Sequence, residues 1–193
     1  MAEKKPLYSG WSKISLVAAI VLSLAVWLFS RQEFFTSAYW LFWLYFPLMM
    51  LHHFEKFTLS DFRGWINKVC FKSNDANFPL KDETAFYFNV VLGYLIPLAL
   101  ILLAPYSIVF PTIAVMYALN LAWFHISYTV GERAYSPGFF TSIFLLLPWA
   151  PITFYHYVSN GELEVWMIGI AFILGLAMHY SLFFRMRLRL QGK

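Results

Sequence analysis

Charged residues are scarce in this sequence. They make up 12% of its 193 residues, against 61% apolar and 21% aromatic residues, and the mean hydropathy is +0.62. Soluble globular domains carry roughly twice that charged fraction, so the chain lacks the polar residues from which a water-facing surface is built. The apolar residues also come in long blocks rather than in the broken stripes of an amphipathic soluble helix. A soluble globular protein is therefore excluded, and an integral membrane protein is indicated.

Several other features are absent. Cys70 is the only cysteine, which excludes an intrachain disulfide framework. The sequence has no phosphate-binding loop, dinucleotide fingerprint, haem-attachment motif or histidine-rich desaturase box. No nucleic-acid partner is expected, because the basic tail at 185–189 is better explained as a topology anchor beside anionic lipid. The expected partners are membrane lipids and a lipid-like substrate.

The sequence does contain six apolar segments, each close to the roughly 20 residues that a helix needs to cross a bilayer. They lie near 14–30, 37–54, 84–104, 107–129, 138–157 and 163–185. The first follows three lysines as a signal peptide would, but its apolar run is too long and lacks a small-residue cleavage site, so we interpret it as a retained span. The prediction is an all-α, polytopic membrane helix bundle of about six transmembrane helices, formed by one integral membrane domain over residues 1–193.

Basic residues predict the orientation of this bundle. With six spans, one side holds both termini and the loops 55–83 and 130–137. That side carries every Lys and Arg of the chain except Arg31. Because cytoplasmic loops carry the excess of Lys and Arg, both termini are expected to be cytoplasmic.

The long loop after the second segment contains a helical pattern. Four apolar residues within 62–69 are spaced i, i+3, i+4 and i+7, and basic residues occupy the other faces. This pattern predicts a short amphipathic helix lying in the cytoplasmic interface, with its apolar face toward the lipid. Ser60 and Asp61 are the candidates for its N-cap.

Ionisable side chains in or beside a membrane span are costly, so they mark candidate functional sites. His52 and Glu55, at the end of the second segment, are three residues apart and share a helix face. An imidazole and a carboxylate so placed either ligate a metal together or act as a base with its orienting carboxylate. A structural polar cluster that ends the span also fits the pattern.

The predicted topology brings more polar residues to the same end of the bundle. Asn120 lies deep in the fourth segment, where its amide needs a partner, and His179 in the sixth segment approaches the same end. His156 lies at the opposite end and is expected to have no special role. The residues expected to converge at the cytoplasmic interface are His52, Glu55, Asn89, His125 and Tyr135.

The order and spacing of several motifs resemble the HXXEE family of small membrane proteins. The matching residues are His52-His53-Phe54-Glu55-Lys56, Phe62-Arg63-Gly64-Trp65-Ile66-Asn67, Asn89, Gly93, Asn120, His125 and Tyr135-Ser136-Pro137-Gly138. The resemblance covers roughly residues 40–155 and implies a metal-binding or catalytic role for the family's His, Glu and Asn residues. The chain departs from the name-giving motif at its second glutamate, which is Lys56 here, and His53 is the candidate to replace it.

The first functional hypothesis is a membrane-embedded enzyme with a lipid-like substrate that enters from the bilayer. In its metal-dependent version, a hydrolase, His52, Glu55 and His125 bind a divalent ion, with zinc the best candidate, and Tyr135 donates a proton. In its metal-free version, the His52–Glu55 pair is the general base of an isomerase or cyclase. The candidates for binding the substrate are Asn89, Asn120 and His53.

Two non-enzymatic hypotheses stay open. The same polar residues would line the cavity of a small-molecule or ion binding or transport protein. The two halves of the chain show no internal repeat, which counts against a secondary transporter. The other alternative is an accessory membrane subunit whose polar cluster pins helices together.

Overall fold

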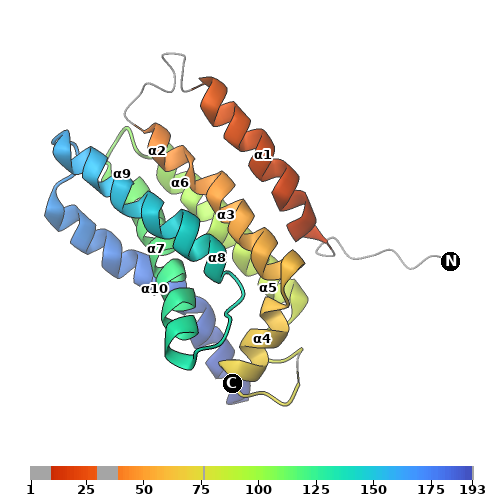
Figure 1. Ribbon diagram of the computed structural model, residues 1–193. Coiled ribbons are helices and arrows are strands. Elements are labelled where there is room, and N and C mark those ends of the chain that lie inside the picture. Colours follow the sequence, from red (N-terminus) through yellow and green to blue (C-terminus); the bar gives the residue numbers. More distant parts are fainter. Residues whose placement is uncertain (1–9, 30–38, 76, 193) are drawn as a thin grey trace.

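The computed structural model describes residues 10–29, 39–75 and 77–192. These residues form seven helical runs, and no strand occurs among them (Figure 1). The predicted all-α fold is therefore confirmed. In chain order, the runs are α1 (Trp11–Phe29), α2 (Trp40–Trp43) with α3 (Tyr45–Phe54) and the π-helical turn η1 (Glu55–Leu59), α4 (Phe62–Val69), α5 (Asp82–Val90) with η2 (Val91–Leu95) and α6 (Ile96–Leu102), α7 (Val109–Glu132), α8 (Phe139–Thr141) with η3 (Ser142–Leu146) and α9 (Leu147–Ser159), and α10 (Val165–Leu190).

Four of these runs are long and apolar enough to cross a membrane, namely Asp82–Leu102, Val109–Glu132, Phe139–Ser159 and Val165–Leu190. They coincide with the last four predicted segments. The first predicted segment corresponds to the shorter apolar helix α1, and the second to α2 and α3.

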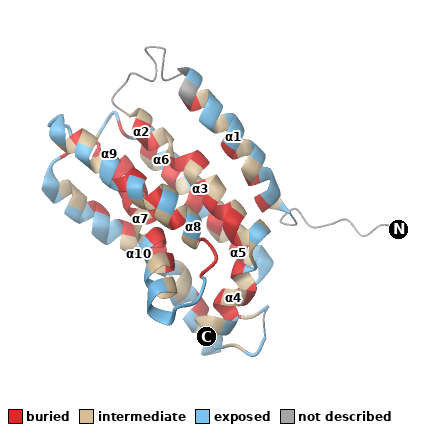
Figure 2. Cartoon of the chain, in the orientation of Figure 1, coloured by how far each residue is buried: buried red, intermediate tan, exposed pale blue. Residues whose placement is uncertain are grey.

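The outer helices expose large apolar side chains. Along α1, Ile14, Val17 and Val21 are each more than half exposed, and Ile173 and Phe184 are equally bare on α10. Figure 2 shows exposed residues along both helices, whereas buried residues concentrate on α3 and α7. In water such continuous apolar faces would drive association, so lipid is the solvent that explains them.

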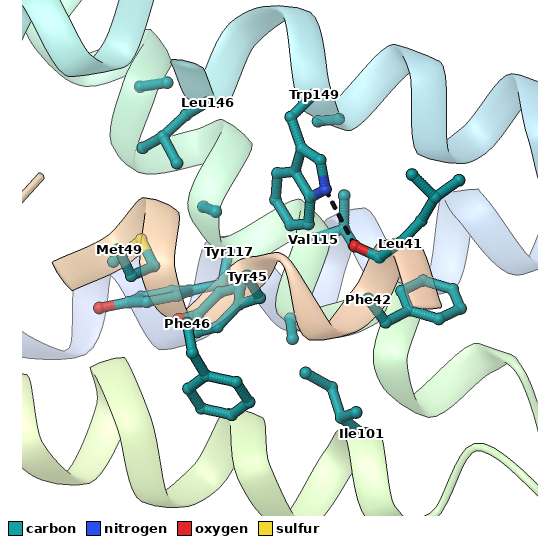
Figure 3. Close-up of a cluster of buried hydrophobic side chains, with 14 of the residues drawn as sticks. Leu41, Phe42, Tyr45, Phe46, Met49, Ile101, Val115, Tyr117, Leu146 and Trp149 are labelled. Carbon is teal, nitrogen blue, oxygen red and sulfur yellow. Dashed lines mark hydrogen bonds between the residues drawn. The ribbon is translucent and has the colours of Figure 1, made fainter. Parts of the chain in front are cut away.

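The core lies where α2 and α3 meet α7 and α9 (Figure 3). Pro47 has no N–H for the carbonyl of Trp43, and the helix is interrupted between α2 and α3 at this level. Beside the interruption, the Trp149 indole N–H donates to the Leu41 carbonyl at 3.0 Å. An indole N–H buried among apolar residues needs such a partner, so this bond ties α9 to α2.

Two of the three π-helical turns in the described part of the chain precede a proline. The turn η2 ends two residues before Pro97, and η3 ends two residues before Pro148. A proline removes the N–H that would bond to the carbonyl four residues earlier, and a widened turn is one way in which a helix accommodates that loss. The third turn, η1, contains Glu55 and begins the candidate site.

The predicted amphipathic helix is present as α4, and Asp61 is its N-cap. Its carboxylate accepts a hydrogen bond from the Gly64 amide at 2.9 Å. Phe62 and Ile66 are buried, and they pack in a cluster with Leu80, Ala85 and Met186. The chain's own residues therefore cover the apolar face that the sequence pattern assigned to lipid.

Candidate functional site

The candidate site is built where the chain leaves α3. His52 and His53 lie in the last turn of α3, Glu55 opens η1, and α7 contributes His125. All four side chains are buried. The loop between α7 and α8 closes over them, so residues that are far apart in the sequence meet at one end of the bundle.

The Glu55 carboxylate lies at the N-terminus of the helix that begins with α8. It accepts hydrogen bonds from the backbone N–H groups of Gly138, Phe140 and Thr141, at 3.2, 3.1 and 2.7 Å. The hydroxyls of Tyr135 and Thr141 add two more, at 2.8 and 2.5 Å. The first N–H groups of a helix have no intrahelical acceptor and favour a negative charge. Glu55 therefore caps this helix, and both of its oxygens are occupied.

A chain of hydrogen bonds connects Glu55 to His52. The Thr141 hydroxyl donates to a Glu55 oxygen at 2.5 Å and lies 2.8 Å from His52 Nδ1. A hydroxyl has one hydrogen to donate, so Thr141 accepts from Nδ1–H of His52. In the neutral imidazole the lone pair is then on Nε2. These two hydrogen bonds thus orient the His52 ring and determine which of its nitrogens carries the proton.

His125 lies beside His52. The ring centres are 5.1 Å apart, in an edge-to-face arrangement, and His125 Nδ1 bonds to the buried Ser136 hydroxyl at 2.8 Å. The Nε2 atoms of His52 and His125 are both buried without a hydrogen-bond partner among the described residues. An unsatisfied buried polar atom costs about 1–3 kcal/mol, and His53 Nε2 is also buried without a hydrogen-bond partner among the described residues.

Gly138 brings the loop into contact with both imidazoles. Its φ is +103°, in the left-handed region. A Cβ built there would lie 2.7 Å from His52 Cε1 and 3.2 Å from His125 Nε2. A glycine is therefore required at this position on two independent grounds.

Lys56 follows Glu55 in η1, where the resemblance described above predicts a second glutamate. It is buried, and its ammonium group lies 4.0 Å from the centre of the Phe62 ring, at cation–π distance. Its stem contacts the Gly138 region. The five hydrogen bonds to Glu55 come from Tyr135, Gly138, Phe140 and Thr141, so its helix-capping role does not depend on the residue at position 56.

Tyr135 closes the cluster on its outer side. It is 43% exposed, donates to Glu55, and lies 3.0 Å from the Ser60 hydroxyl. Burial of its inner part raises the pKa of the Tyr135 phenol above its ordinary value, so the group stays protonated at neutral pH. The phenol therefore joins the loop to the end of η1.

His53 points into a different environment. Its Nδ1 lies 2.6 Å from the Tyr94 hydroxyl, and its ring packs edge-to-face on Trp11 at 5.4 Å. A Cβ on Gly93 would lie 3.0 Å from His53 Cε1. Asn89 is one turn before Gly93 and shares its helix face, so it belongs to the His53 side of the cluster.

The remaining polar residues of the sequence analysis form no hydrogen bond to His52, Glu55 or His125 among the described residues. The Asn89 amide donates to the Ala85 carbonyl at 2.6 Å. The Asn120 Nδ2 and both ring nitrogens of His179 are buried without a hydrogen-bond partner in the described part of the chain. His156 is bonded weakly to Asn160, at 3.4 Å, on the last turns of α9 and away from the site.

The three predicted metal ligands present two free nitrogens, on His52 and His125, and an occupied carboxylate on Glu55. Catalytic zinc sites normally have three protein ligands. Within residues 10–29, 39–75 and 77–192, no group of three His, Cys, Asp or Glu side chains is arranged to hold a metal ion. The donor set does not fit zinc in this arrangement, and zinc binding stays a prediction for experiment.

Sequence reasoning missed Thr141 and Tyr94, the two hydroxyl partners of the adjacent histidines. Thr141 is 89 residues from His52 in the chain, and nothing in the sequence links the two.

The sequence model of one protein family, described as "Protein of unknown function with HXXEE motif", matches residues 43–153, more than half of the chain. The matched range includes both histidines of the pair, Glu55 and the loop that closes over them. Comparisons with curated proteins and with solved structures find no match.

Proposed function

Since this chain belongs to the HXXEE family, whose function is unknown, we propose that it is a membrane-embedded enzyme that performs acid–base chemistry on an apolar, lipid-like substrate. His52 is the general base and His125 is its acidic counterpart. Glu55 and Thr141 position His52, and Gly138 keeps the loop backbone against the pair.

One observation carries this proposal: two adjacent, fully buried imidazoles each leave Nε2 unpartnered among the described residues. A cluster that served only to pin helices would gain from satisfying these atoms, because buried polar groups in folded proteins are overwhelmingly hydrogen-bonded. Glu55, by contrast, is fully satisfied and has the structural role. The contrast between the satisfied carboxylate and the two unpartnered nitrogens favours a binding site over a purely structural cluster.

The hydrogen bonds of the two histidines are compatible with a different tautomer of each ring. His52 Nδ1–H donates to Thr141, so its Nε2 accepts a proton from the substrate, and the Glu55 charge behind Thr141 offsets the unfavourable effect of the neighbouring Lys56 ammonium on the resulting imidazolium. If the Ser136 hydroxyl donates to His125 Nδ1, the proton of neutral His125 is on Nε2. One nitrogen then removes a proton and the other returns one, as in an isomerase or cyclase, and transfer of the proton gained by His52 to the adjacent His125 restores both neutral rings. Tyr135 and the Asn120 amide are the further candidates for contacting the substrate.

The same proposal includes a multi-pass topology of six spans with both termini cytoplasmic. In Figure 1 the start of α1, the end of α3, the start of α5 and the ends of α7 and α10 lie at one end of the bundle. A hydrogen bond of 2.7 Å between Ser12 and Thr58 joins the start of α1 to η1. This end carries the basic loops, so the histidine pair would lie near the cytoplasmic interface.

Hydrogen exchange into lipids tests the chemistry even though the substrate is unidentified. The purified protein is reconstituted with a total lipid extract of its host membrane in D₂O buffer, and mass spectrometry follows deuterium uptake and new lipid species. We expect one lipid class to change with the wild type and to change about 100-fold more slowly with His52→Gln or His125→Gln. His156→Gln is the matched control and should behave as the wild type.

Two results would overturn the proposal. One is a lipid profile that stays unlabelled with the wild type, and the other is labelling that His52→Gln leaves intact. Elemental analysis of the same samples decides the metal question. Near-stoichiometric metal in the wild type that both His52→Gln and His125→Gln lose would replace the metal-free mechanism by the predicted metal-dependent one.

A further inference from the structure

A groove separate from the histidine pair runs between the α5–η2 run and the last turns of α10. It consists of two adjoining cavities of about 240 and 280 Å³, which share Tyr87, Phe88 and Arg185 in their linings. The first cavity is also lined by Glu83, Thr84 and Arg189, and the second by Val91, Leu92 and Ser181. One end of the groove is therefore charged and the other is mainly apolar.

The charged end has an excess of positive charge. Arg189 is half-buried and is held by hydrogen bonds from one guanidinium nitrogen to the Pro79 carbonyl and the Thr84 hydroxyl, at 3.2 and 3.0 Å. Arg185 is exposed, and no ion pair or hydrogen bond of its side chain is found among the described residues. Glu83 is the carboxylate of this lining. Two guanidinium groups against one carboxylate favour an anion.

The apolar end excludes a small soluble anion as the best occupant. Tyr87 and Val91 are 55% and 41% exposed, and they follow one another down the α5–η2 run at helical spacing. A free phosphate would make no contact with this apolar surface, and a plain hydrocarbon would form no ion pair with either arginine. The ligand that matches both ends is an amphiphile with an anionic head.

We propose that this groove binds one anionic glycerophospholipid, with its phosphate at Arg185 and Arg189 and one acyl chain along Val91, Leu92 and Ser181. The site rests on the membrane topology proposed above and is independent of the acid–base chemistry. Basic residues next to a span attract anionic lipid in general. A pre-positioned arginine and a cavity that continues into an apolar groove make a site for a single molecule.

Native mass spectrometry of the full chain, released from nanodiscs that contain phosphatidylglycerol and phosphatidylcholine, measures the bound lipid directly. We expect one retained phosphatidylglycerol, and a loss of affinity of about tenfold with Arg185→Gln, since one charge-assisted contact is removed. Arg187→Gln is the matched control: it is exposed on the same helix, removes the same charge and lines neither cavity. It should retain the lipid.

Ser181→Leu tests the apolar end, because it fills the groove and leaves both arginines unchanged. It should also lose phosphatidylglycerol. Equal losses with Arg185→Gln and Arg187→Gln would overturn the site in favour of diffuse surface charge, and full binding by Ser181→Leu would overturn the seated acyl chain. His52→Gln should bind phosphatidylglycerol as the wild type does, so failure of the enzyme proposal and failure of this one are distinguishable.

Discussion

His52 and His53 are neighbours in the chain, yet the helix points them into two different surroundings. Both are fully buried, and both bond through Nδ1 to a hydroxyl. The hydroxyl beside His52 is that of Thr141, which passes its own hydrogen to the Glu55 carboxylate, whereas the hydroxyl beside His53 is that of Tyr94. Burial and residue type are therefore shared, and the carboxylate behind the hydroxyl distinguishes the two sites. In the proposed function this difference gives His52 the acid–base role, whereas His53, whose Nε2 is also buried without a partner among the described residues, is a candidate for binding the substrate.

Removing the charge of Glu55 should destabilise the protein more than any other substitution at this site. In Glu55→Gln, an amide N–H₂ would face backbone N–H donors, and the negative charge at the helix start would be lost. We expect the free energy of unfolding to fall by about 3 kcal/mol, as for other buried charged networks that lose a member, and the melting temperature in detergent to fall by about 10 °C. Glu162→Gln, on an exposed residue at the other end of the bundle, should shift it by under about 2 °C. Similar melting temperatures for the two variants would contradict the capping role.

A side chain on Gly138 should disturb His52 and His125 and leave the surroundings of His53 unchanged. Gly138→Ala combines left-handed strain with a contact of 2.7 Å to His52 Cε1, and it should cost about 2 kcal/mol of stability. Gly131→Ala is the control: Gly131 lies inside α7, and the methyl group that alanine adds there would have no neighbouring atom within 4 Å among the described residues. That substitution should be neutral or stabilise by up to about 1 kcal/mol. Thermal unfolding of the pair in the same detergent measures the difference, and equal melting temperatures would show that the loop backbone does not contact the imidazoles.

Removing the Thr141 or the Tyr94 hydroxyl tests whether the Glu55 carboxylate distinguishes His52 from His53. Thr141→Val and Tyr94→Phe each leave one Nδ1 buried without its partner, so each should cost about 1–2 kcal/mol of stability. Only Thr141→Val separates an imidazole from Glu55. It should slow the proposed deuterium labelling of lipid about tenfold, because the hydrogen-bonded link to the carboxylate is lost, and Tyr94→Phe should not.

Nitrogen-15 NMR of histidine-labelled protein gives a readout that does not depend on activity. His52 should show the Nδ1–H tautomer in the wild type and a mixture in Thr141→Val. Labelling rates that fall equally in Thr141→Val and Tyr94→Phe would mean that Glu55 does not act through Thr141.

The helices were predictable because hydropathy is a local property. Four predicted segments are helices long enough to span a membrane, and the spacing of apolar residues also predicted α4 and its Asp61 cap. The surroundings of α4 were not predictable, because Leu80 folds back onto its apolar face from the following loop and Met186 reaches it from the far end of the chain. The same amphipathic pattern fits a helix whose apolar face contacts lipid and a helix whose apolar face packs against protein.

The candidate site was predictable in part for the same reason. Topology alone brought His125 and Tyr135 to His52 and Glu55, and the structure places them in contact. The hydrogen-bond partners could not be predicted, because nothing in the sequence distinguishes Thr141 from the rest of its apolar segment. Only the fold places it between Glu55 and His52. The i, i+3 spacing of those two residues predicted a direct pair, whereas the structure joins them through the Thr141 hydroxyl.

The smallest expected effect concerns the His53 side. Gly93→Ala would place a methyl group 3.0 Å from His53 Cε1, but φ at Gly93 is ordinary, so only the contact opposes it. The ring needs to shift by a few tenths of an ångström, and the gain in helix propensity of up to about 1 kcal/mol offsets part of that cost. We expect a change in unfolding free energy below about 1 kcal/mol and unchanged lipid labelling. A loss of stability as large as that of Gly138→Ala would show that His53 is packed as tightly as His52. His53 would then need to be included in the proposed chemistry.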